Sequence, residues 1–461
     1  MKNIFQWLLP FALCVVFVFA RVTCYGPMND SVAVQDSESY FETAEKASFS
    51  LEFFEQQRSI TLPLLIHLSN PTGEHELTNL SEPFFQTEPR LAIQPGTENL
   101  IRNQTVISIV CWVLFALLAA SSVNGWFAKA LMTLLILFCG FVPQVADWDS
   151  IISSESLSIS LFVLVLGILF KVMPDGKGDR TGKWIAAVLM LPVSFFWVFT
   201  RDTNAWFIIG AALVLIIAGI VNWVGRKVQN ISALICGFCL LGIFFFHQVT
   251  FTESERWLLP LLNNLTANVF PYEDRVEFFA KTGMPTDEET LSITGSAEYN
   301  NIYENEKFLH WARRFGMDTY RDFLLSRPVW TVLQVYENLD SFFEENRQPF
   351  FYGSDQQRPH WAEKPGNLIH PLSAGVILID LLLLILLACK AANTGDGTDI
   401  RFFRTLLALF IGGGLLMSIA YLGEVRSVWR HVLGGVMALR MLVWLGIASL
   451  FSVPERKNSS D

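Results

Sequence analysis

The hydrophobic positions of the chain fall into ten long runs separated by polar segments. The runs cover residues 4–20, 104–122, 126–145, 153–172, 183–200, 205–224, 230–249, 369–391, 403–422 and 432–452. A helix needs about 17–25 predominantly apolar residues to cross the hydrocarbon layer of a bilayer, so each run predicts a transmembrane helix. The first run has a short core, from Trp7 to Phe19, and a signal peptide is the alternative interpretation there.

Two polar segments are much longer than the other connections. Residues 21–103 follow the first run, and residues 250–368 are numerous enough to form a compact cap instead of a loop. We expect an all-α polytopic membrane protein of about ten transmembrane helices with an exterior helical cap. The expected units are a first transmembrane helix or uncleaved signal anchor (1–20), an exterior loop with an acidic motif and interfacial helices (21–103), helices two to seven (104–249), an exterior helical domain (250–368), helices eight to ten (369–452) and a cytoplasmic tail (453–461).

The composition places the chain in the same class. Only 16% of its 461 residues are charged and 52% are hydrophobic, whereas about 25% of the residues of a soluble protein are charged. The formal net charge of −10 comes without any basic stripe, which excludes a nucleic-acid-binding surface. Six of the seven cysteines lie in apolar runs, so neither a disulfide framework nor a zinc site is indicated.

Basic residues in the short loops predict the orientation. If ten helices alternate, the loops that carry them all fall on one side, which positive residues mark as cytoplasmic. We therefore expect both termini in the cytoplasm, and the long polar segments on the exterior face of the cytoplasmic membrane. The residues that set this orientation are Lys2, Lys171, Lys177, Arg180, Lys183, Arg226, Lys227, Lys390, Arg401, Arg404, Arg456 and Lys457.

An acidic stretch, 36-DSESYFETA-44, follows the first run. A carboxylate held against a membrane surface loses solvation, which raises its pKa and suits it to act as a general base. Asp36 and Glu38 are the candidates for this role, and they could equally hold a divalent ion. The alternative is that these charges only keep an exterior loop solvated.

A second acidic stretch, 147-DWDSIISSESLSISLF-162, begins the fourth run. Asp149 or Glu155 at the N-terminal end of a helix can serve as a cap, because free amides and the helix dipole stabilise a carboxylate there. Capping does not explain the serines that continue into the run. They either satisfy one another and the backbone or line a polar cavity.

Two exterior turns carry basic residues at the membrane edge. In 201-RDTNAW-206, Arg201, Asp202 and Asn204 can form a self-satisfied turn, or the planar guanidinium of Arg201 can bind a phosphate. In 423-GEVRSVWRHVLG-434, residues Arg426, Arg430 and His431 run against the positive-inside trend. A lipid phosphate on the exterior leaflet, or a salt bridge to Glu424, would account for them.

Two charges fall near the middle of the membrane. Asp380 lies in the eighth run and Arg440 in the tenth, and their similar depth predicts that they pair. His247, near the outer end of the seventh run, is expected to be an interfacial residue. A transporter or channel would place charges deep in several helices, and the sequence does so only at Asp380 and Arg440.

Several short motifs together resemble a known family. The chain is similar to C-type (GT-C) membrane glycosyltransferases, polytopic enzymes that use polyprenyl-phosphate-linked sugars. The likeness is carried by the acidic motif Asp36-Ser37-Glu38-Ser39-Tyr40, by 57-QRSITLPLL-65, by Ser154-Glu155-Ser156, by the turn 199–204, and by 256-RWLLPLLNNL-265 followed by Gly283-Met284-Pro285. Where many members have consecutive acidic residues, this chain has Asp36-Ser37-Glu38.

The resemblance implies a role for each candidate residue. An aspartate in the first exterior loop acts as general base on the acceptor or helps hold a metal, Mg²⁺ or Mn²⁺, and Asp36 matches it, with Glu38 as the fallback. Basic residues at the membrane edge hold the lipid phosphate, which assigns this role to Arg201, Arg426, Arg430 and His431. Acceptor-binding or cavity-lining roles fall to Glu155, Asp149, Asn204 and Arg256.

The expected function follows from these roles. The chain would move a sugar from a polyprenyl-phosphate donor to a glycan, lipid or protein acceptor on the exterior face. One alternative is a polymerase or ligase of lipid-linked glycans that relies on exterior arginines and a histidine. A non-enzymatic transporter and a membrane scaffold without activity are the others.

Overall fold

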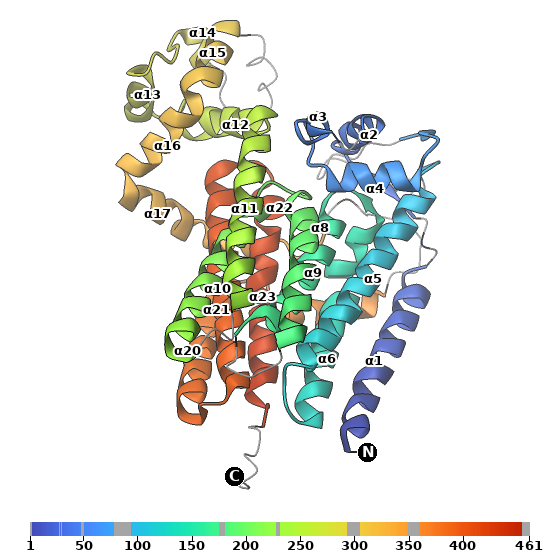
Figure 1. The fold of residues 1–461 in the computed structure, drawn as a ribbon. Helices are drawn as coiled ribbons and strands as arrows, with labels where there is room; N and C mark the ends of the chain where they lie inside the picture. Colours follow the sequence, from blue (N-terminus) through green and yellow to red (C-terminus); the bar gives the residue numbers. More distant parts are fainter. Residues whose placement is uncertain are drawn as a thin grey trace.

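Long helices run side by side and are covered at one end by shorter ones (Figure 1). The computed structural model describes residues 2–26, 28, 30–47, 50–77, 94–174, 180–226, 231–292, 305–348, 350 and 359–453. The predicted tail from residue 454 onward lies outside the described residues. So do Lys177, Lys227, Arg456 and Lys457, on which the expected orientation partly depends.

Among the described residues, nine of the ten predicted runs each form one long apolar helix, and the run 126–145 forms a bent pair of helices. Within the described residues, nine are long and apolar enough to cross a membrane individually. They are α1 (Lys2–Cys24), α5 (Glu98–Ala120), α8 (Glu155–Val172), α9 (Arg180–Val198), α10 (Asn204–Arg226), α11 (Ile231–Glu253), α20 (Val376–Thr394), α21 (Gly397–Gly423) and α23 (Leu433–Leu450). The predicted all-α, multi-pass membrane fold is confirmed.

The helix formed by the run 126–145 is broken near its end. Helix α6 (Trp126–Phe141) is followed by α7 (Pro143–Ala146) and a 3₁₀ turn, η1 (Asp147–Ser150), and the two parts meet at 55°. Proline lacks a backbone N–H and is best tolerated in the first turn of a helix, so Pro143 ends one helix and begins the next. The bend turns Asp147–Ser150 into the end of the bundle where α8 begins.

Small residues bring the central helices close together. Gly210 of α10 faces Gly412 of α21, and a Cβ added to Gly210 would lie 2.8 Å from the Cα of Gly412. Lipid tails are as apolar as leucine, so membrane helices associate mainly by close packing, for which small residues suit the interface. This crossing places the ends of α10 and α21 beside each other under the short helices.

One end of the bundle, which we call the cap face, carries all the short elements. On one side of it lie α2 (Ser37–Glu45), α3 (Leu51–Phe54) and α4 (Thr61–Ser69), next to α5, α8 and α9 (Figure 1). A short helix, α22 (Val428–His431), connects α21 to α23 at the same end. Helix α1 begins and α23 ends at the opposite end of the bundle.

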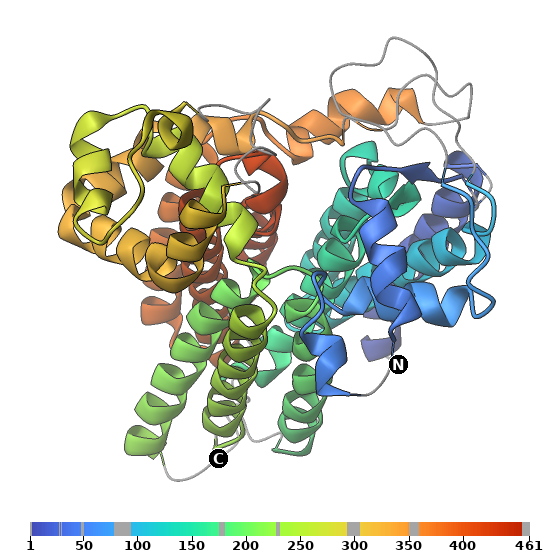
Figure 2. The same cartoon turned by 90° about the horizontal axis from the view of Figure 1, so that it is seen from above.

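The cap consists of α12 (Leu258–Asn268), α13 (Glu273–Ala280), α14 (Glu288–Leu291), α15 (Glu306–Trp311), a π-helical turn (Ala312–Gly316), α16 (Met317–Ser326) and α17 (Pro328–Glu337). It has its own apolar core, in which Leu265, Phe279, Phe308 and Phe323 are almost fully buried. Figure 2 shows the cap and α2–α4 on opposite sides of the cap face.

After the cap, the chain crosses the cap face through α18 (Leu339–Phe343), a 3₁₀ turn (His360–Ala362) and α19 (Glu363–Ile369). This crossing supplies the partners of Arg440. Its guanidinium donates to the Pro371 carbonyl at 2.9 and 3.1 Å and to the Phe343 carbonyl at 3.4 Å. The predicted Asp380–Arg440 pair is therefore wrong: among the described residues, the Asp380 carboxyl has no hydrogen-bond partner.

Candidate functional site

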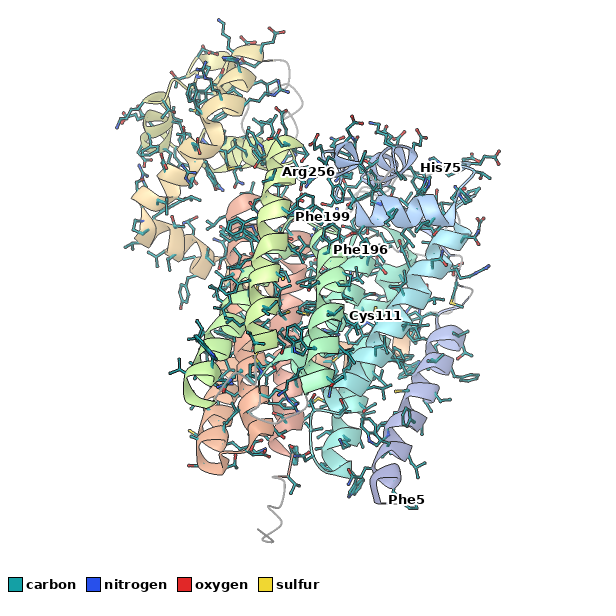
Figure 3. All side chains as sticks on the ribbon, in the orientation of Figure 1. Phe5, His75, Cys111, Phe196, Phe199 and Arg256 are labelled. Atoms are coloured by element: carbon teal, nitrogen blue, oxygen red, sulfur yellow. The ribbon has the colours of Figure 1, made fainter. Side chains whose placement is uncertain are left out.

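A cavity of 620 Å³ lies on the cap face, between α2 and the cap. One wall is polar and comes from Asp36, the segment 57–59, the turn 200–203 and α22. The other wall is largely apolar and comes from the end of α11, the start of α12, α16 and the end of α21. Figure 3 labels Arg256 and Phe199 at this end of the bundle. Such a cavity can hold a ligand with one charged and one hydrocarbon part.

The loop before α2 is tied to the loop before α8. Strand β1 (Val32–Ala33) pairs in parallel with β2 (Ile151–Ile152). The Ser37 hydroxyl accepts from the Val34 N–H at 2.8 Å and donates to the Ile152 carbonyl at 2.7 Å. Asp36 stands at the N-cap of α2, but its side chain makes no capping hydrogen bond. The carboxylate is therefore available for other partners.

Two arginines from distant parts of the chain hold the Asp36 carboxylate. Arg58 Nη2 donates to Oδ1 at 2.8 Å, and both Nη atoms of Arg430 lie 3.2 Å from Oδ2. The Arg58 guanidinium also lies over the Tyr40 ring, 5.0 Å from its centroid, and its Nε donates to the Ser39 hydroxyl at 2.6 Å. The Asp36 carboxylate thus links Arg58, in the first long polar segment, to Arg430 on α22.

Arg430 also connects Asp36 to a buried carboxylate at the start of α8. Its Nε donates to Glu155 Oε1 at 2.7 Å, and Arg201 Nη1 lies 2.7 Å from the same oxygen. The Glu155 side chain is fully buried, and its N-cap neighbour Ser154 makes no side-chain capping bond. Glu155 is thus an ion-pair partner, and the capping interpretation is wrong. We call Asp36, Arg58, Glu155, Arg201 and Arg430 the arginine–carboxylate cluster.

The pairing keeps Asp36 ionised. Burial favours the protonated carboxyl, but the charges of Arg58 and Arg430 outweigh it, so the pKa of Asp36 lies below its ordinary value. The sequence predicted the opposite direction, from desolvation alone. For the same reason, the pKa of Arg430 is raised: burial opposes the charge, and Glu155 and Asp36 outweigh burial.

A second polar group, formed around Asp202, lies next to the arginine–carboxylate cluster. Asp202 Oδ1 accepts from the Ser59 hydroxyl at 3.0 Å, from His247 Nε2 at 3.0 Å and from Arg256 Nε at 3.1 Å. Because Ser59 and Asp202 directly follow Arg58 and Arg201, the two groups share the same two turns of backbone. Burial raises the pKa of Asp202, but Arg256 and His247 bring it well below its ordinary value.

Arg256 connects this second polar group to the end of α3 and the segment that follows it. Its Nη1 donates to the carbonyls of Phe54 and Gln56, each at 3.1 Å. Nη2 is buried and has no hydrogen-bond partner among the described residues. His247 is buried too, so the prediction of an interfacial histidine is wrong. Its pairing with Asp202 makes it part of the cavity wall.

Glu424 lies on the cap side of the cavity, just past the end of α21. Both of its carboxyl oxygens accept from Asn263 Nδ2, at 3.1 and 3.0 Å, and Oε1 accepts from the backbone N–H of Arg426 at 2.8 Å. Burial raises the pKa of Glu424 to about 7. The Tyr320 hydroxyl donates to the Leu422 carbonyl at 2.8 Å. These bonds attach α12 and α16 of the cap to the bundle.

Four of the predicted site residues lie elsewhere. Glu38 is exposed on α2, and the cavity wall formed by the described residues includes neither Glu38 nor Arg426. Asp149 is buried in an ion pair with Arg21 and accepts from the Ser156 hydroxyl at 2.6 Å. Asn204 donates to Ser158, Trp197 and Thr200, which holds the turn before α10 together.

His431 lines the cavity beside Arg201 and Arg430. Burial and the repulsion of both arginines together lower the pKa of His431 to about 3. The ring is therefore neutral at physiological pH and can accept or donate a hydrogen bond without carrying a charge.

The described residues do not assemble a metal-binding set. Nowhere among them do three His, Cys, Asp or Glu side chains come together as ligands for an ion. Asp36, the expected ligand, has guanidinium groups on both of its oxygens. Hard cations such as Mg²⁺ need several oxygen ligands, so this arrangement does not fit one.

Arg58 was given no role by reasoning from the sequence, and Asp202 and His247 were interpreted as a turn residue and an interfacial residue, whereas all three line the cavity. Arg58 was contained in a motif that carried the family resemblance, but its charge was given no role. Asp202 directly follows Arg201 in a turn between two membrane helices, where a charged pair is costly unless it has partners. The energetic cost of an unpartnered Arg201–Asp202 pair in this turn was the signal in the sequence that could have revealed the role of Asp202.

Comparisons with known proteins found similar structures but no similar sequences. No family model matches the chain, and no curated protein matches it. An oligosaccharyltransferase of Archaeoglobus fulgidus, solved with an inhibitory peptide and dolichol-phosphate, is 10% identical with a TM-score of 0.44, over 97% of this chain and 50% of that one. The same enzyme, solved with a tethered acceptor peptide, is 12% identical with a TM-score of 0.44, over 97% and 50% of the two chains.

The archaeal enzyme is a GT-C polytopic membrane glycosyltransferase, the class that the motifs of this chain resemble. This chain spans about half the length of the structures it matches.

Proposed function

We propose that the chain is an integral-membrane glycosyltransferase that moves a sugar from a polyprenyl-phosphate donor to an acceptor on the exterior face, with Asp36 as general base. The observation that carries the proposal is the cavity itself. A carboxylate and three arginines line it together with apolar side chains of α12, α16 and α21. A lipid phosphate ester has a charged and an apolar part in one molecule.

The arginine–carboxylate cluster supplies the charge that such a donor needs. It contains three guanidinium groups and two carboxylates, so one positive charge in the cluster is left unbalanced. A phosphodiester carries one negative charge, which balances it. Planar guanidinium groups bind phosphate oxygens in pairs, and the presence of Arg58 and Arg430 in the cavity wall supports this role for them.

The reaction would break the bond between the anomeric carbon and the phosphate oxygen of the donor. A hydroxyl or amide of the acceptor attacks the anomeric carbon, its proton passes to the Asp36 carboxylate, and the lipid phosphate leaves with the bonding electron pair. The positive charge of Arg430 and Arg58 stabilises the negative charge that develops on the leaving phosphate. The reaction as proposed uses the side chains of the protein and no metal ion.

Donor binding would also make Asp36 a better base. With both arginines on it, the carboxylate has a lowered pKa and attracts a proton weakly. A donor phosphate competes for the same guanidinium groups, which weakens their pull on Asp36 and lets its pKa rise. The base would thus become active only in the presence of the donor.

The remaining polar residues suit the acceptor and the sugar. Asp202, Ser59, His247 and Arg256 line the same cavity and offer both donors and acceptors of hydrogen bonds. We assign them to binding of hydroxyl groups. Glu155 pairs with both Arg430 and Arg201, and this contact stabilises the position of Arg430.

A polymerase or ligase of lipid-linked glycans is the second candidate, because Arg430 and the neutral His431 share the cavity wall. In that case His431 would act as the base, and Asp36 would only position Arg430.

Reconstituted protein separates the two. Incubation with labelled polyprenyl-phosphate hexoses and a panel of lipid, glycan and peptide acceptors should release polyprenyl phosphate from the wild type. Asp36→Asn should lower the release about 10²- to 10⁴-fold, as expected for loss of a general base, and His431→Gln should change it little. Full release by Asp36→Asn together with loss in His431→Gln would refute the base role of Asp36 and favour the second candidate.

A further inference from the structure

A second, smaller hollow lies away from the candidate site. Its volume is 170 Å³, and it lies between α17, α18, α20, α21 and α23. Val335 of α17 and Leu339 of α18 form one side, and Ile377 of α20 and Phe410 of α21 form the other. These positions belong to the half of the bundle next to the cap face.

The walls of this hollow are hydrocarbon. Ser418 is the one hydroxyl among its described lining residues, and its Oγ donates to the Gly414 carbonyl at 2.8 Å, one turn earlier in the same helix. The hydroxyl therefore needs no partner inside the hollow. A cavity of about 150 Å³ lined by such side chains stays free of water and binds an apolar molecule as large as benzene.

Gly414 keeps the hollow open. A Cβ placed on Gly414 would meet no atom within 4 Å, in contrast to Gly412 and Gly413 of the same helix, where it would meet neighbours at 2.8 and 2.9 Å. The close approaches at Gly412 and Gly413 are needed for packing. Gly414 faces open space, and any larger side chain there would fill it.

The hollow opens onto a surface that faces lipid. On α20, Leu378 and Leu382 are 71% and 58% exposed, and on α17, Val332 and Tyr336 are 66% and 69% exposed. None of the ten residues of α17, all of them described, is buried. Helix α20 is long and apolar enough to cross a membrane, and the exposed apolar side chains of α17 extend the surface that α20 would present to a bilayer.

The hollow is separate from the donor cavity. An α-helix turns about 100° per residue, so Phe410, Gly414 and Ser418 of α21 lie on one face of the helix. Ile419 and Gly423, which line the donor cavity, lie on the opposite face. A donor held in the cavity by its phosphate would direct its chain along the other side of α21.

We propose that the acyl chain of a bilayer phospholipid binds in this hollow, as a fixed part of the folded protein, and holds α17 and α18 against α20 and α21. The length of chain that fits is about six carbons, from the size of the apolar cavity that accommodates benzene. Through α17 and α18, the bound chain would set the position of the cap relative to the bundle.

The test uses protein reconstituted in bilayers that contain a phospholipid with a photoreactive diazirine on its palmitoyl chain. After irradiation, the labelled peptides are identified by mass spectrometry. Wild-type protein should be labelled on segments 335–342 and 410–418. Gly414→Leu should lower this labelling by about tenfold or more, since each methylene excluded from an apolar site weakens binding roughly fourfold.

Two further variants control for folding and for ordinary lipid contact. Gly242 of α11 is likewise exposed with no atom within 4 Å of an added Cβ, and Gly242→Leu should leave the labelling of both segments unchanged. Gly414→Ala should give an intermediate value. Equal labelling in wild type and Gly414→Leu, or an equal loss in Gly242→Leu, would overturn the proposal. Competition by unlabelled polyprenyl phosphate would also overturn it, because the donor chain would then be the occupant.

Discussion

Replacing Asp36 with asparagine should strengthen the binding of a lipid phosphate while stopping transfer. The carboxylate occupies the two guanidinium groups that we assign to the phosphate, Arg58 at 2.8 Å and Arg430 at 3.2 Å. Asparagine has nearly the same shape but no charge, so both arginines become more available. A residue that acted only as a base would leave binding unchanged.

The size of the effect follows from the exposure of the pairs. The Asp36 side chain is 32% exposed, and those of Arg58 and Arg430 are 28% and 15% exposed. Partly exposed ion pairs contribute at most about 1 kcal/mol each, so removing the charge of Asp36 frees about 1–2 kcal/mol. At about 1.4 kcal/mol per tenfold change in affinity, the dissociation constant should fall roughly 5- to 30-fold.

The assay is titration of purified protein with farnesyl phosphate, followed by calorimetry or by the rise in melting temperature. Glu38→Gln is the matched control, because it removes one charge from the same helix at an exposed position outside the cavity wall. Its dissociation constant should equal that of the wild type. Raising the ionic strength should weaken binding in all three proteins.

Weaker or unchanged binding by Asp36→Asn would refute the idea that Asp36 and the donor phosphate compete for the same arginines. Tighter binding with full transfer would support the competition and refute the base. Each result therefore contradicts a different step of the mechanism.

Three more predictions test the surroundings of the site. Asp149→Asn leaves the buried Arg21 without its carboxylate partner, and it should lower the free energy of unfolding by about 3–5 kcal/mol without changing the affinity of the folded protein for farnesyl phosphate. Arg430→Lys removes the planar fork and should weaken that affinity about tenfold or more in the same titration. Glu424 has an ordinary pKa of 4.5 and about 7 in the folded protein, so the folded state holds a proton that the unfolded state releases. The contribution of Glu424 to stability should therefore be complete below pH 4.5 and fall by about 3 kcal/mol toward pH 7, whereas Asp36 and Asp202, whose pKa values are lowered, lose their contributions on acidification. Glu424→Gln should flatten this profile in thermal unfolding.

Each of these has an outcome that contradicts it. A large loss of affinity in Asp149→Asn would mean that the Arg21 pair is coupled to the cavity. Normal affinity in Arg430→Lys would mean that Arg430 does not bind the phosphate through its fork. An unchanged pH profile in Glu424→Gln would place the responsible proton on another group.

The membrane helices could be predicted because the bilayer imposes a length on them. Each of the ten apolar runs became a long helix, and even the broken one was recognised as a run. The boundaries were less certain where prolines and polar residues stand at the edge. The run 369–391 includes Pro371, which disfavours the helical conformation in the residue before it, so α19 ends at Ile369 and the long helix begins only at Val376.

The site was predicted only in part. Asp36, Glu155, Arg201 and Arg430 were each identified as charges at the membrane edge, and the structure brings all four into one network. Their partners could not be predicted, because Asp36 and Arg430 are separated by 394 positions along the chain. Asp149 resembled Glu155 in the sequence, yet it pairs with Arg21 instead.

Hydropathy by itself determined the number of membrane helices and placed the charged turns together at one end of the bundle. It can do so because hydrocarbon accepts almost no charge, and a helix has only two ends. Which of those charges meet was decided by the tertiary structure, through the pairing of β1 with β2, the bend at Pro143 and the crossing of α10 with α21. A buried charge is stable only with a partner within a few ångströms, and distances of that kind come from packing alone.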